Sequence, residues 1–339
     1  MSKYTVYHTD IATSTFGDYP IEREILTRGG AELRLIQPHK TADELCTLMA
    51  DADAIIVSKA PITAAVLDSM PNCKVVVRYG VGLDTLDLDA AAERGVICAH
   101  VPDFCAEEVS NHALMLMLAA VKKVVLLDRW VRDGSWRPRS FTPMQHLHGQ
   151  TLGLIACGNI GRAFARKAQA LNMQVLAYDP YCDPAQAQTL GIRLLSNLNE
   201  LLAQSDIVSV HAPLTGETRH MINAEALAAM KPSAYLLNTA RGPIVDQQAL
   251  IAALQSGQIA GAGLDVFEQE PLPADSPLTS MENVVLTPHS ASYSDYAFQL
   301  LSRRVAESVI DVLEGYWPRF VANPAVREKV QLKPVRSVD

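Results

Sequence analysis

The sequence lacks the features that mark membrane, secreted and nucleic-acid-binding proteins. None of its apolar runs reaches the roughly 18 residues of a membrane span, and no apolar stretch follows a basic start at the N-terminus, so we expect a cytoplasmic protein that contacts no membrane. No basic stripe is visible and the formal net charge is -8, so no nucleic-acid partner is expected. The six cysteines form no CxxC pair, which favours reduced thiols. No cluster of metal-ligating side chains is visible either, and we expect no metal.

Aromatic residues are also scarce, at 6% of the chain. Together with the recurrent Gly, Ala, Val and Leu, this scarcity suits helices packed on parallel strands better than an all-β barrel. The hydrophobic fraction of 49% and the charged fraction of 19% are ordinary for a globular enzyme. Because 339 residues exceed the size at which one hydrophobic core stops growing, we expect two domains.

Short apolar segments alternate with helical patterns in two separate runs, which predicts an α/β fold with two Rossmann- or flavodoxin-like lobes and parallel sheets. The strands expected in the first lobe are Lys3–His8, Ala31–Ile36, Ala54–Val57, Val75–Arg78 and Val96–Ala99. The strands expected in the second lobe are Thr151–Ala156, Gln174–Tyr178, Ile207–His211, Ala234–Asn238, Ala260–Leu264 and Val284–Leu286.

Two long helical patterns, Ala106–Leu127 and Ser292–Gly315, are expected to join the lobes. They place one domain at residues 1–101 and 291–339 and the other at 102–290. The first pattern is apolar around most of its surface, and an irregular arm with two tryptophans, Trp130–Pro138, follows it. So much apolar surface predicts a two-fold homodimer built on this helix and arm.

A dinucleotide-binding turn is predicted at the start of the second lobe. The strand ending at Ala156 leads into Gly158, Asn159, Ile160 and Gly161, and a helix follows. Here the backbone N–H groups and the helix N-terminus would face a pyrophosphate, although Ala156 replaces the first glycine of the usual G-x-G-x-x-G pattern. The next strand ends at Asp179, whose carboxylate would accept the ribose hydroxyls and repel a 2′-phosphate. We therefore expect NAD rather than NADP, bound by the domain at 102–290.

Three segments at or just after strand ends in the second lobe carry an arginine, a carboxylate and a histidine. They are Asn238–Pro243 with Arg241, Asp265–Pro271 with Glu270, and Pro288–Ala291 with His289. A guanidinium can hold a substrate carboxylate with two hydrogen bonds, and an imidazolium can protonate a carbonyl oxygen as hydride arrives. A carboxylate behind the histidine would orient it. Each residue alone would be unremarkable in a loop, but their shared location favours a catalytic site.

The chain resembles the D-isomer-specific 2-hydroxyacid dehydrogenases, and the resemblance extends from about residue 50 to residue 320. The segments that carry it are Arg78–Asp84, Val101-Pro102, Val208–Thr215, Asn238–Val245, Gly263–Pro271 and Thr287–Ser290. The resemblance implies that Arg241 anchors the substrate, Glu270 partners the histidine, and His289 is the acid/base. It also implies that the backbone of Val81 and Gly82 in the domain at 1–101 and 291–339, the substrate-binding (catalytic) domain, holds the substrate carboxylate. The further cofactor-binding residues that it implies are His211, Pro213, Thr239, Ala240 and Asp265.

Several alternatives remain within this family. Formate dehydrogenases carry Gln in place of Glu270, which argues against formate, and Ala291–Ser294 resembles the C-terminal binding protein branch. A corepressor-like protein that senses NAD(H), or a dehydrogenase for an oxyanion such as phosphite, is therefore an alternative to an enzyme acting on a small 2-oxo or 2-hydroxy acid. Lys59 and Arg78 could bind a second anionic group, and a solvated lysine and a structural arginine explain them equally well. The remaining histidines of the region are interpreted as structural: His100, His112, His146 and His148.

Overall fold

The computed structural model describes residues 2–9, 19–37, 40–136, 141 and 143–336. The chain divides into two compact units, which are described separately below. Unit 1 comprises Met1–Phe104 and Ser294–Asp339, and unit 2 comprises Cys105–Tyr293. The sequence predicts domain boundaries at 101/102 and 290/291. Each lies a few residues before the corresponding boundary in the structure. Within the described residues, no helix is both long and apolar enough to cross a lipid bilayer.

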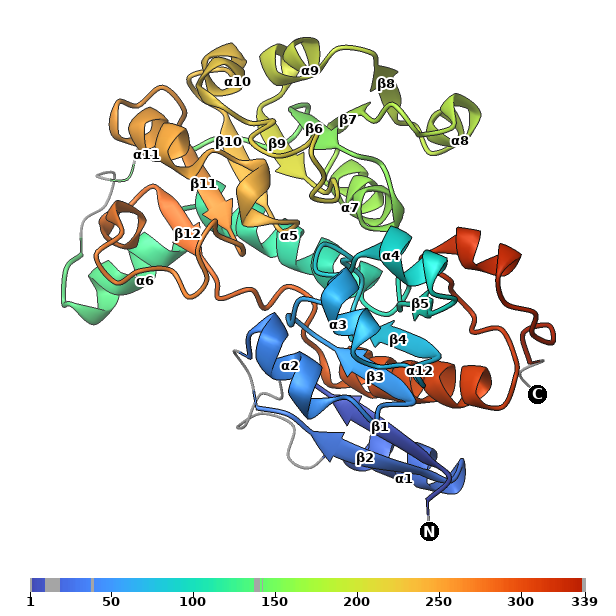
Figure 1. The fold of residues 1–339 in the computed structure, drawn as a ribbon. Coiled ribbons are helices and arrows are strands. Elements are labelled where there is room, and N and C mark those ends of the chain that lie inside the picture. The colour runs from blue at the N-terminus through green and yellow to red at the C-terminus, as the bar shows by residue number, and fades with distance from the viewer. Residues whose placement is uncertain (1, 10–18, 38–39, 137–140, 142, 337–339) are drawn as a thin grey trace. The chain divides into compact units, whose positions relative to one another are not determined.

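Unit 1 is built on a parallel sheet of five strands in the order β2-β1-β3-β4-β5 (Figure 1). This is the flavodoxin-like order, in which the connections leave β1 in opposite directions along the sheet. Every strand expected from the sequence is present, which confirms the α/β interpretation of this half. The strands are β1 (Tyr4–His8), β2 (Ala31–Leu35), β3 (Ala54–Val57), β4 (Val75–Arg78) and β5 (Ile97–Ala99).

Helices cover both faces of this sheet because its central strands are apolar on both sides. One face carries α1 (Pro20–Arg28) and α12 (Asp295–Leu313), which pack on each other and on the sheet. The other face carries α2 (Ala42–Leu48), α3 (Ala64–Asp68) and α4 (Leu88–Glu93) over a shared apolar core. A capping box starts α2, since Thr41 and Glu44 each donate a backbone N–H to the side chain of the other.

Unit 2 is built on seven parallel strands in the order β12-β11-β10-β9-β6-β7-β8 (Figure 1). The chain passes from β6 outward to β8 and then returns to continue on the other side of β6, which is the Rossmann order with a switch point between β6 and β9. The strands are β6 (Thr151–Ile155), β7 (Gln174–Tyr178), β8 (Arg193–Leu195), β9 (Ile207–Val210), β10 (Tyr235–Asn238), β11 (Gly261–Leu264) and β12 (Val284–Leu286).

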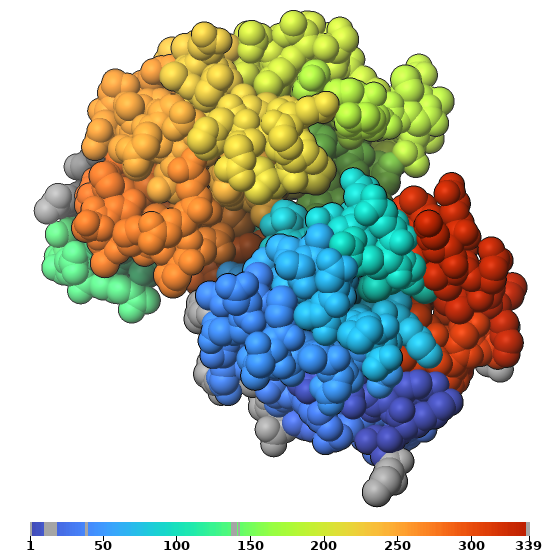
Figure 2. Space-filling view, viewed as in Figure 1, coloured from blue at the N-terminus to red at the C-terminus, as the bar shows by residue number. Residues whose placement is uncertain are grey.

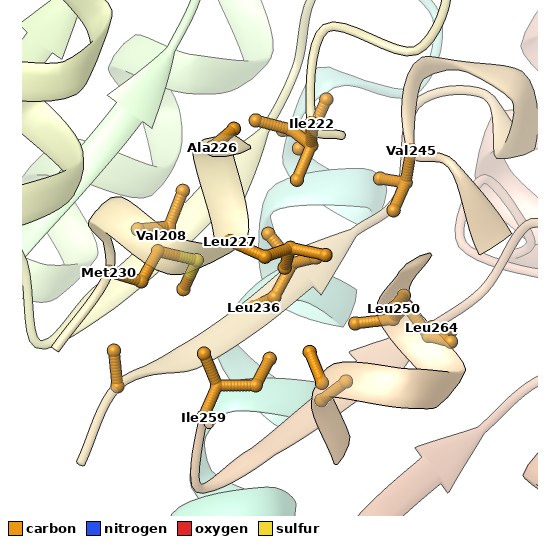
Figure 3. Close-up of a cluster of buried hydrophobic side chains, with 14 of the residues drawn as sticks. Val208, Ile222, Ala226, Leu227, Met230, Leu236, Val245, Leu250, Ile259 and Leu264 are labelled. Atoms are coloured by element: carbon orange, nitrogen blue, oxygen red, sulfur yellow. The ribbon is translucent and has the colours of Figure 1, made fainter. Parts of the chain in front are cut away.

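Two apolar cores sandwich the sheet of unit 2. On one face α5 (Ala106–Val121) and α7 (Asn159–Ala170) pack over the strands, with α8 (Pro184–Thr189) beside them. On the other face lie α9 (Leu198–Gln204), α10 (Ala224–Ala229) and α11 (Gln247–Gln255). Figure 3 shows part of this second core, where Leu227 of α10 and Met230, the residue after this helix, pack with Leu236 of β10. Both faces of every central strand are therefore buried, and this burial fixes the register of the strands. Polar residues follow the ends of these strands.

Three local expectations differ from the structure. The helix expected over Ala106–Leu127 is two helices, because Lys123 adopts a left-handed conformation with φ 53° and α6 (Val124–Arg132) begins after it. Trp130 therefore lies in a helix rather than in an irregular arm, while Arg137 and Pro138 are outside the described residues. The short edge strand β8 is not among the strands expected from the sequence, since polar residues hide its pattern. A 3-10 helix at Pro324–Glu328 follows α12 in the chain.

Candidate active site

The three segments that carry Arg241, Glu270 and His289 meet at the carboxyl edge of the sheet of unit 2. β10, β11 and β12 lie side by side, and Asn238, Leu264 and Leu286 are aligned at their ends. The chain leaves each strand in the same direction, so the next residues of all three form one edge of the sheet. The structure therefore places these three segments at one edge of the sheet, as inferred from the sequence.

His289 and Glu270 form a hydrogen-bonded pair at this edge. The Nδ1 atom of His289 lies 2.7 Å from Oε2 of Glu270. The other carboxylate oxygen accepts a hydrogen bond of 3.2 Å from the backbone N–H of Phe267, so Glu270 is itself fixed. The side chain of His289 is 39% exposed and that of Glu270 is 23% exposed. With Nδ1 held by the carboxylate, Nε2 is the ring nitrogen that can exchange a proton with a bound molecule.

Asp265 anchors the loop that carries His289, a role that the sequence did not reveal. Its buried carboxylate accepts backbone hydrogen bonds of 2.9 Å from Ser290 and from Ala291, and one of 2.6 Å from the hydroxyl of Thr287. Burial opposes the charge of Asp265, but these hydrogen bonds and one from His112 outweigh it and lower the pKa of the carboxyl. The loop is thus wrapped around a fixed anion, and within it His289 takes a left-handed backbone with φ 51°.

His112, interpreted from the sequence as structural, completes this anchor. Its Nε2 atom lies 2.9 Å from the Thr287 hydroxyl and 3.4 Å from Oδ1 of Asp265. The histidine comes from α5, more than 150 residues away in the chain, so no local pattern could connect it to the His289 loop.

The Arg241 loop is locked against the Glu270 loop by a glycine. A Cβ atom on Gly242 would lie 1.9 Å from the carbonyl carbon of Phe267, so only glycine permits the two loops to approach this closely. Asn238 braces the same loop, since its amide donates to the carbonyl of Arg241 at 2.9 Å and accepts from the N–H of Ala240 at 3.0 Å. The guanidinium of Arg241 donates to the carbonyl of Ala240 at 2.8 Å.

A second histidine–glutamate pair lies in unit 2. Nε2 of His220 is 2.7 Å from Oε1 of Glu268, and His220 also has a left-handed backbone, with φ 52°. His220 precedes β10 in the chain, so this pair is not on the loop that follows β12. The family resemblance implies that Glu270 partners His289, and the structure pairs Glu270 with His289 and Glu268 with His220.

The turn after β6 has the shape that a pyrophosphate requires. Ala156 has φ 72°, the left-handed conformation that the first glycine of the usual pattern adopts easily. A Cβ atom on Gly158 would meet nothing within 4 Å, whereas one on Gly161 would lie 2.6 Å from the carbonyl oxygen of Ala156. α7 begins at Asn159 without a side-chain cap, so its first N–H groups, including those of Asn159 and Ile160, can donate hydrogen bonds to an anion.

Asp179 is held rigidly at the end of the adjacent strand β7. Its two carboxylate oxygens accept backbone hydrogen bonds from Cys157 at 2.8 Å and from Tyr181 at 2.9 Å. Each oxygen keeps a further lone pair, which suits a ribose diol. Asp179 is thus hydrogen-bonded to the glycine-rich turn. A site for the adenosine half of a dinucleotide requires this arrangement.

Two polar atoms are left without partners at the ends of the neighbouring strands β9 and β10. Nδ1 of His211 and Oγ1 of Thr239 are buried and accept or donate no hydrogen bond within the described chain. The other ring nitrogen of His211 lies 2.9 Å from the Ser209 hydroxyl, and burial lowers the pKa of His211 to about 4, so the ring stays neutral. Pro213 is exposed on the loop after His211, and Ala240 is half-buried after Thr239. Unpaired buried groups at this edge fit a polar ligand such as a nicotinamide carboxamide.

The remaining candidates lie in unit 1, at the carboxyl edge of β3 and β4. Arg78 ends β4, and its guanidinium donates to the carbonyl of Tyr79 at 2.7 Å. Val81 and Gly82 follow in a loop where the Val81 carbonyl lies 3.1 Å from Nδ1 of His100. Lys59 is exposed just beyond β3. These residues share one edge of the sheet of unit 1, because β3 and β4 are neighbours in it.

The family model described as D-isomer specific 2-hydroxyacid dehydrogenase, NAD binding domain, matches residues 114–291. A glyoxylate reductase of Korarchaeum cryptofilum is 41% identical over 304 residues, which cover 88% of this chain and 87% of the relative.

Two solved structures carry a bound cofactor and are similar along nearly their whole length. The D-lactate dehydrogenase of Aquifex aeolicus, complexed with NAD and lactic acid, has a TM-score of 0.81 and 31% identity and is matched over 91% of this chain and 95% of its own. An NADPH-dependent glyoxylate/hydroxypyruvate reductase of Sinorhizobium meliloti, in complex with NADP and malonate, has a TM-score of 0.82 and 29% identity over 99% and 100% of the two chains.

Proposed function

This chain belongs to the D-isomer-specific 2-hydroxyacid dehydrogenases, oxidoreductases that use a nicotinamide dinucleotide, and from that membership we propose that it interconverts a small 2-oxo acid and the D-2-hydroxy acid with NAD(H). The observation that carries the proposal is the hydrogen bond of 2.7 Å between His289 and Glu270 beside Arg241, at the edge of a Rossmann sheet. Hydride transfer to a carbonyl carbon needs a proton for the carbonyl oxygen, and this pair can provide it.

We infer that His289 is the general acid in reduction and the general base in oxidation. In reduction the imidazolium donates the proton on Nε2 to the developing alkoxide, while Glu270 holds Nδ1–H and stabilises the positive charge. In oxidation neutral His289 accepts the proton of the hydroxyl through the same nitrogen. The dinucleotide, when bound, supplies or accepts the hydride at C2. The left-handed backbone at His289, fixed by Asp265, supports this role because it holds the ring in one direction.

Arg241 is proposed to bind the substrate carboxylate with two parallel hydrogen bonds and to polarise the adjacent carbonyl. Unit 1 is proposed as the substrate-binding (catalytic) domain, in which backbone N–H groups of Val81 and Gly82 bind the same carboxylate. Lys59 and Arg78 are candidates for a second anionic group on larger substrates. The relatives whose names specify glyoxylate, hydroxypyruvate or lactate all act on small acids of this class.

Unit 2 is proposed as the NAD-binding domain. The glycine turn and the start of α7 would bind the pyrophosphate, Asp179 the adenosine ribose, and the ends of β9 to β11 the nicotinamide. The proposed cofactor-binding residues are Gly158, Asn159, Ile160, Gly161, Asp179, His211, Pro213, Thr239, Ala240 and Asp265.

The proposed activity can be tested with a steady-state screen of 2-oxo acids, including glyoxylate, hydroxypyruvate and pyruvate, in the presence of NADH. We expect at least one to be reduced with catalytic turnover, and the product to be the D isomer by chiral chromatography. Binding of NADH without turnover on any acid of the screen would instead favour a sensor of NAD(H). Turnover with phosphite and NAD, and with none of the acids, would favour an oxyanion dehydrogenase.

Asp179 is expected to make the enzyme prefer NADH. The carboxylate repels a 2′-phosphate, so kcat/KM with NADH should exceed that with NADPH by at least about tenfold, which corresponds to roughly 1.4 kcal/mol. Asp179→Ala should lower the ratio of kcat/KM with NADH to kcat/KM with NADPH, mainly because NADH binds more weakly. The matched control is Asp183→Ala, which removes the exposed carboxylate that caps α8 four residues later. Equal kcat/KM values for the two cofactors in the unmodified enzyme would refute the assignment of Asp179.

A two-fold homodimer is expected through α5 and α6. Apolar side chains of these helices and of the segment after them are exposed in the single chain, and Figure 2 shows the α6 part of this surface in green. They are Met115, Val124, Val125, Val131 and Trp136. Light scattering at micromolar concentration should give twice the mass of the chain, and Val131→Asp should shift it toward the monomer. Val335→Asp, at an exposed valine of unit 1, should leave the mass unchanged. A monomeric mass for the unmodified protein would contradict the dimer.

A further inference from the structure

We propose that His100 is a positioning residue for the substrate, because it donates its Nδ1 proton to the carbonyl of Val81 and so directs the N–H of Gly82 toward the substrate carboxylate. The sequence alone suggests only a structural role for this histidine, and the transfer of hydride and proton does not involve it. The inference rests on the proposed role of the Val81 and Gly82 amides in binding the carboxylate. The residues that carry it all belong to unit 1.

The two peptide groups that would bind the carboxylate are each held at their carbonyl end. The first joins Gly80 to Val81, and its carbonyl accepts a hydrogen bond of 3.1 Å from the N–H of Val101. The second joins Val81 to Gly82, and its carbonyl lies 3.1 Å from Nδ1 of His100. In a trans peptide the C=O and the N–H point in opposite directions. Both N–H groups therefore point away from the segment that follows β5.

These two N–H groups are available to a ligand. Among the described residues, no hydrogen-bond acceptor is found for the N–H of Val81 or for that of Gly82. Neighbouring backbone N–H groups that point the same way form a binding site for an anion such as a carboxylate. A hydrogen bond accepted by the carbonyl of a peptide group also polarises that group and makes its N–H a stronger donor. His100 therefore both orients and strengthens the N–H of Gly82.

The contact with Val81 determines which ring nitrogen of His100 carries the proton. A carbonyl oxygen can only accept a hydrogen bond, so Nδ1 must be the donor. Burial lowers the pKa of His100 and outweighs the opposite effect of the hydrogen bond with Val81, so the ring is neutral at physiological pH. A neutral imidazole has a single N–H. The structure therefore requires the tautomer in which Nδ1 is protonated and Nε2 is not.

The C-terminal part of the chain holds the ring of His100 in place. This segment runs beside the edge strand β5, where the N–H of Ala322 donates to the carbonyl of Cys98 at 2.7 Å. Phe320 consequently lies next to His100, with the two ring centroids 6.3 Å apart and the planes at 84°. Such an edge-to-face contact restricts rotation of the imidazole. Because the support comes from the other end of the chain, no local sequence pattern indicates the role of His100.

The start of the same loop is fixed without His100. The N–H of Tyr79 donates to the carbonyl of Val57 at 2.7 Å. The hydroxyl of Tyr79 donates to the buried carboxylate of Glu22 at 2.7 Å and is hydrogen-bonded to the hydroxyl of Ser302 at 2.8 Å. Loss of the imidazole should therefore release the second peptide group while the rest of the loop keeps its place, which makes the effect on substrate binding measurable.

The kinetic test compares two replacements of His100, using the best acid among glyoxylate, hydroxypyruvate and pyruvate. His100→Ala should raise KM at least about tenfold and leave kcat within about threefold, because the carboxylate is bound equally in the ground state and the transition state. The dissociation constant for NADH should stay within about twofold. His100→Asn should bring KM back to within about threefold of the unmodified enzyme, because the asparagine amide can donate in place of Nδ1. The control is His220→Ala, which removes a hydrogen-bonded histidine of unit 2 and should leave KM within about twofold.

The hydrogen bond itself is tested by heteronuclear NMR of the full-length protein with isotopically labelled histidine, in slightly alkaline buffer. We expect Nδ1 of His100 to carry the proton and Nε2 to be unprotonated. The signals of this ring are identified by their loss from the spectrum of His100→Asn. The measurement needs neither substrate nor dinucleotide, so it does not depend on the proposed activity.

Three results would overturn the proposal. The first is an unprotonated Nδ1, which could not donate to Val81. The second is an unchanged KM in His100→Ala, which would leave the proposed function intact. The third is an equally raised KM in the alanine and asparagine variants, which would assign the effect to packing of the ring rather than to its proton. Failure of the unmodified protein to reduce any of the acids would instead contradict the proposed function, and the NMR measurement would still decide whether the hydrogen bond exists.

Discussion

Replacing His289 with alanine should lower kcat for reduction of the best 2-oxo acid by about 10²- to 10⁴-fold, the usual value of general acid catalysis. The variant has no group at Nε2 to protonate the developing alkoxide, whereas the surfaces proposed for cofactor binding are unchanged. The dissociation constant for NADH should therefore stay within about twofold of its original value. Single-turnover kinetics and fluorescence titration measure the two quantities separately.

The chain contains a matched control for this experiment. His220 also has a left-handed backbone and a glutamate partner at 2.7 Å, but its segment does not follow the end of β12. His220→Ala should therefore leave kcat within about twofold. If His289→Ala also stays within about twofold, His289 is not the acid, and the roles assigned to Glu270 and Arg241 lose their basis.

Replacing Asp265 with alanine should cost roughly 3 kcal/mol of unfolding free energy and should also lower kcat, because it frees the His289 loop. The N–H groups of Ser290 and Ala291 and the Thr287 hydroxyl would lose their charged acceptor in a buried environment. Urea unfolding at pH 7 measures the stability, and kcat is measured on the folded protein.

The pH dependence of stability provides an independent check on Asp265. Its pKa is lowered in the folded protein below the usual value of an aspartate, so the ionised form favours folding. That contribution is complete above the unfolded pKa and is lost as pH falls from about 4 through the folded value. Asp265→Ala should therefore lose less stability than the unmodified protein on acidification through this range.

Asp206 supplies the control for the kinetic part. Its carboxylate accepts from the N–H of Thr151 at 2.9 Å and from Lys231 at 2.8 Å, at the amino ends of β6 and β9. Asp206→Ala should lower stability while kcat of the folded enzyme stays within about twofold. If Asp265→Ala behaves in the same way, Asp265 does not position His289.

Much of the fold follows from the sequence because strand ends carry local signals. The apolar runs of β1 and β3 to β5, and of β6, β7 and β9 to β12, are bounded by polar or glycine residues, so both sheets could be predicted. Since strands of one parallel sheet end at one edge, the shared location of Arg241, Glu270 and His289 could be predicted as well. The partner of His289 came from the family resemblance, which gives that role to Glu270.

What the sequence could not provide depends on backbone conformation and on distant contacts. Lys123 breaks the predicted helix in a left-handed conformation without a glycine or proline to signal it. The anchor at Asp265 requires His112 from α5 and the amides of Ser290 and Ala291 from the loop after β12, and no periodicity connects them. The close approach of Gly242 to Phe267 likewise joins two loops that follow different strands.

The division of unit 1 between the two ends of the chain has a consequence for synthesis on the ribosome. Its five strands emerge first, but α12, which packs on β3 and β4, is translated only after β12 of unit 2. Unit 2 is continuous from Cys105 to Tyr293 and can complete its core while α12 is still inside the exit tunnel. The half of the molecule made first is therefore finished last, and until then an apolar face of β3 and β4 is open to chaperones and to aggregation.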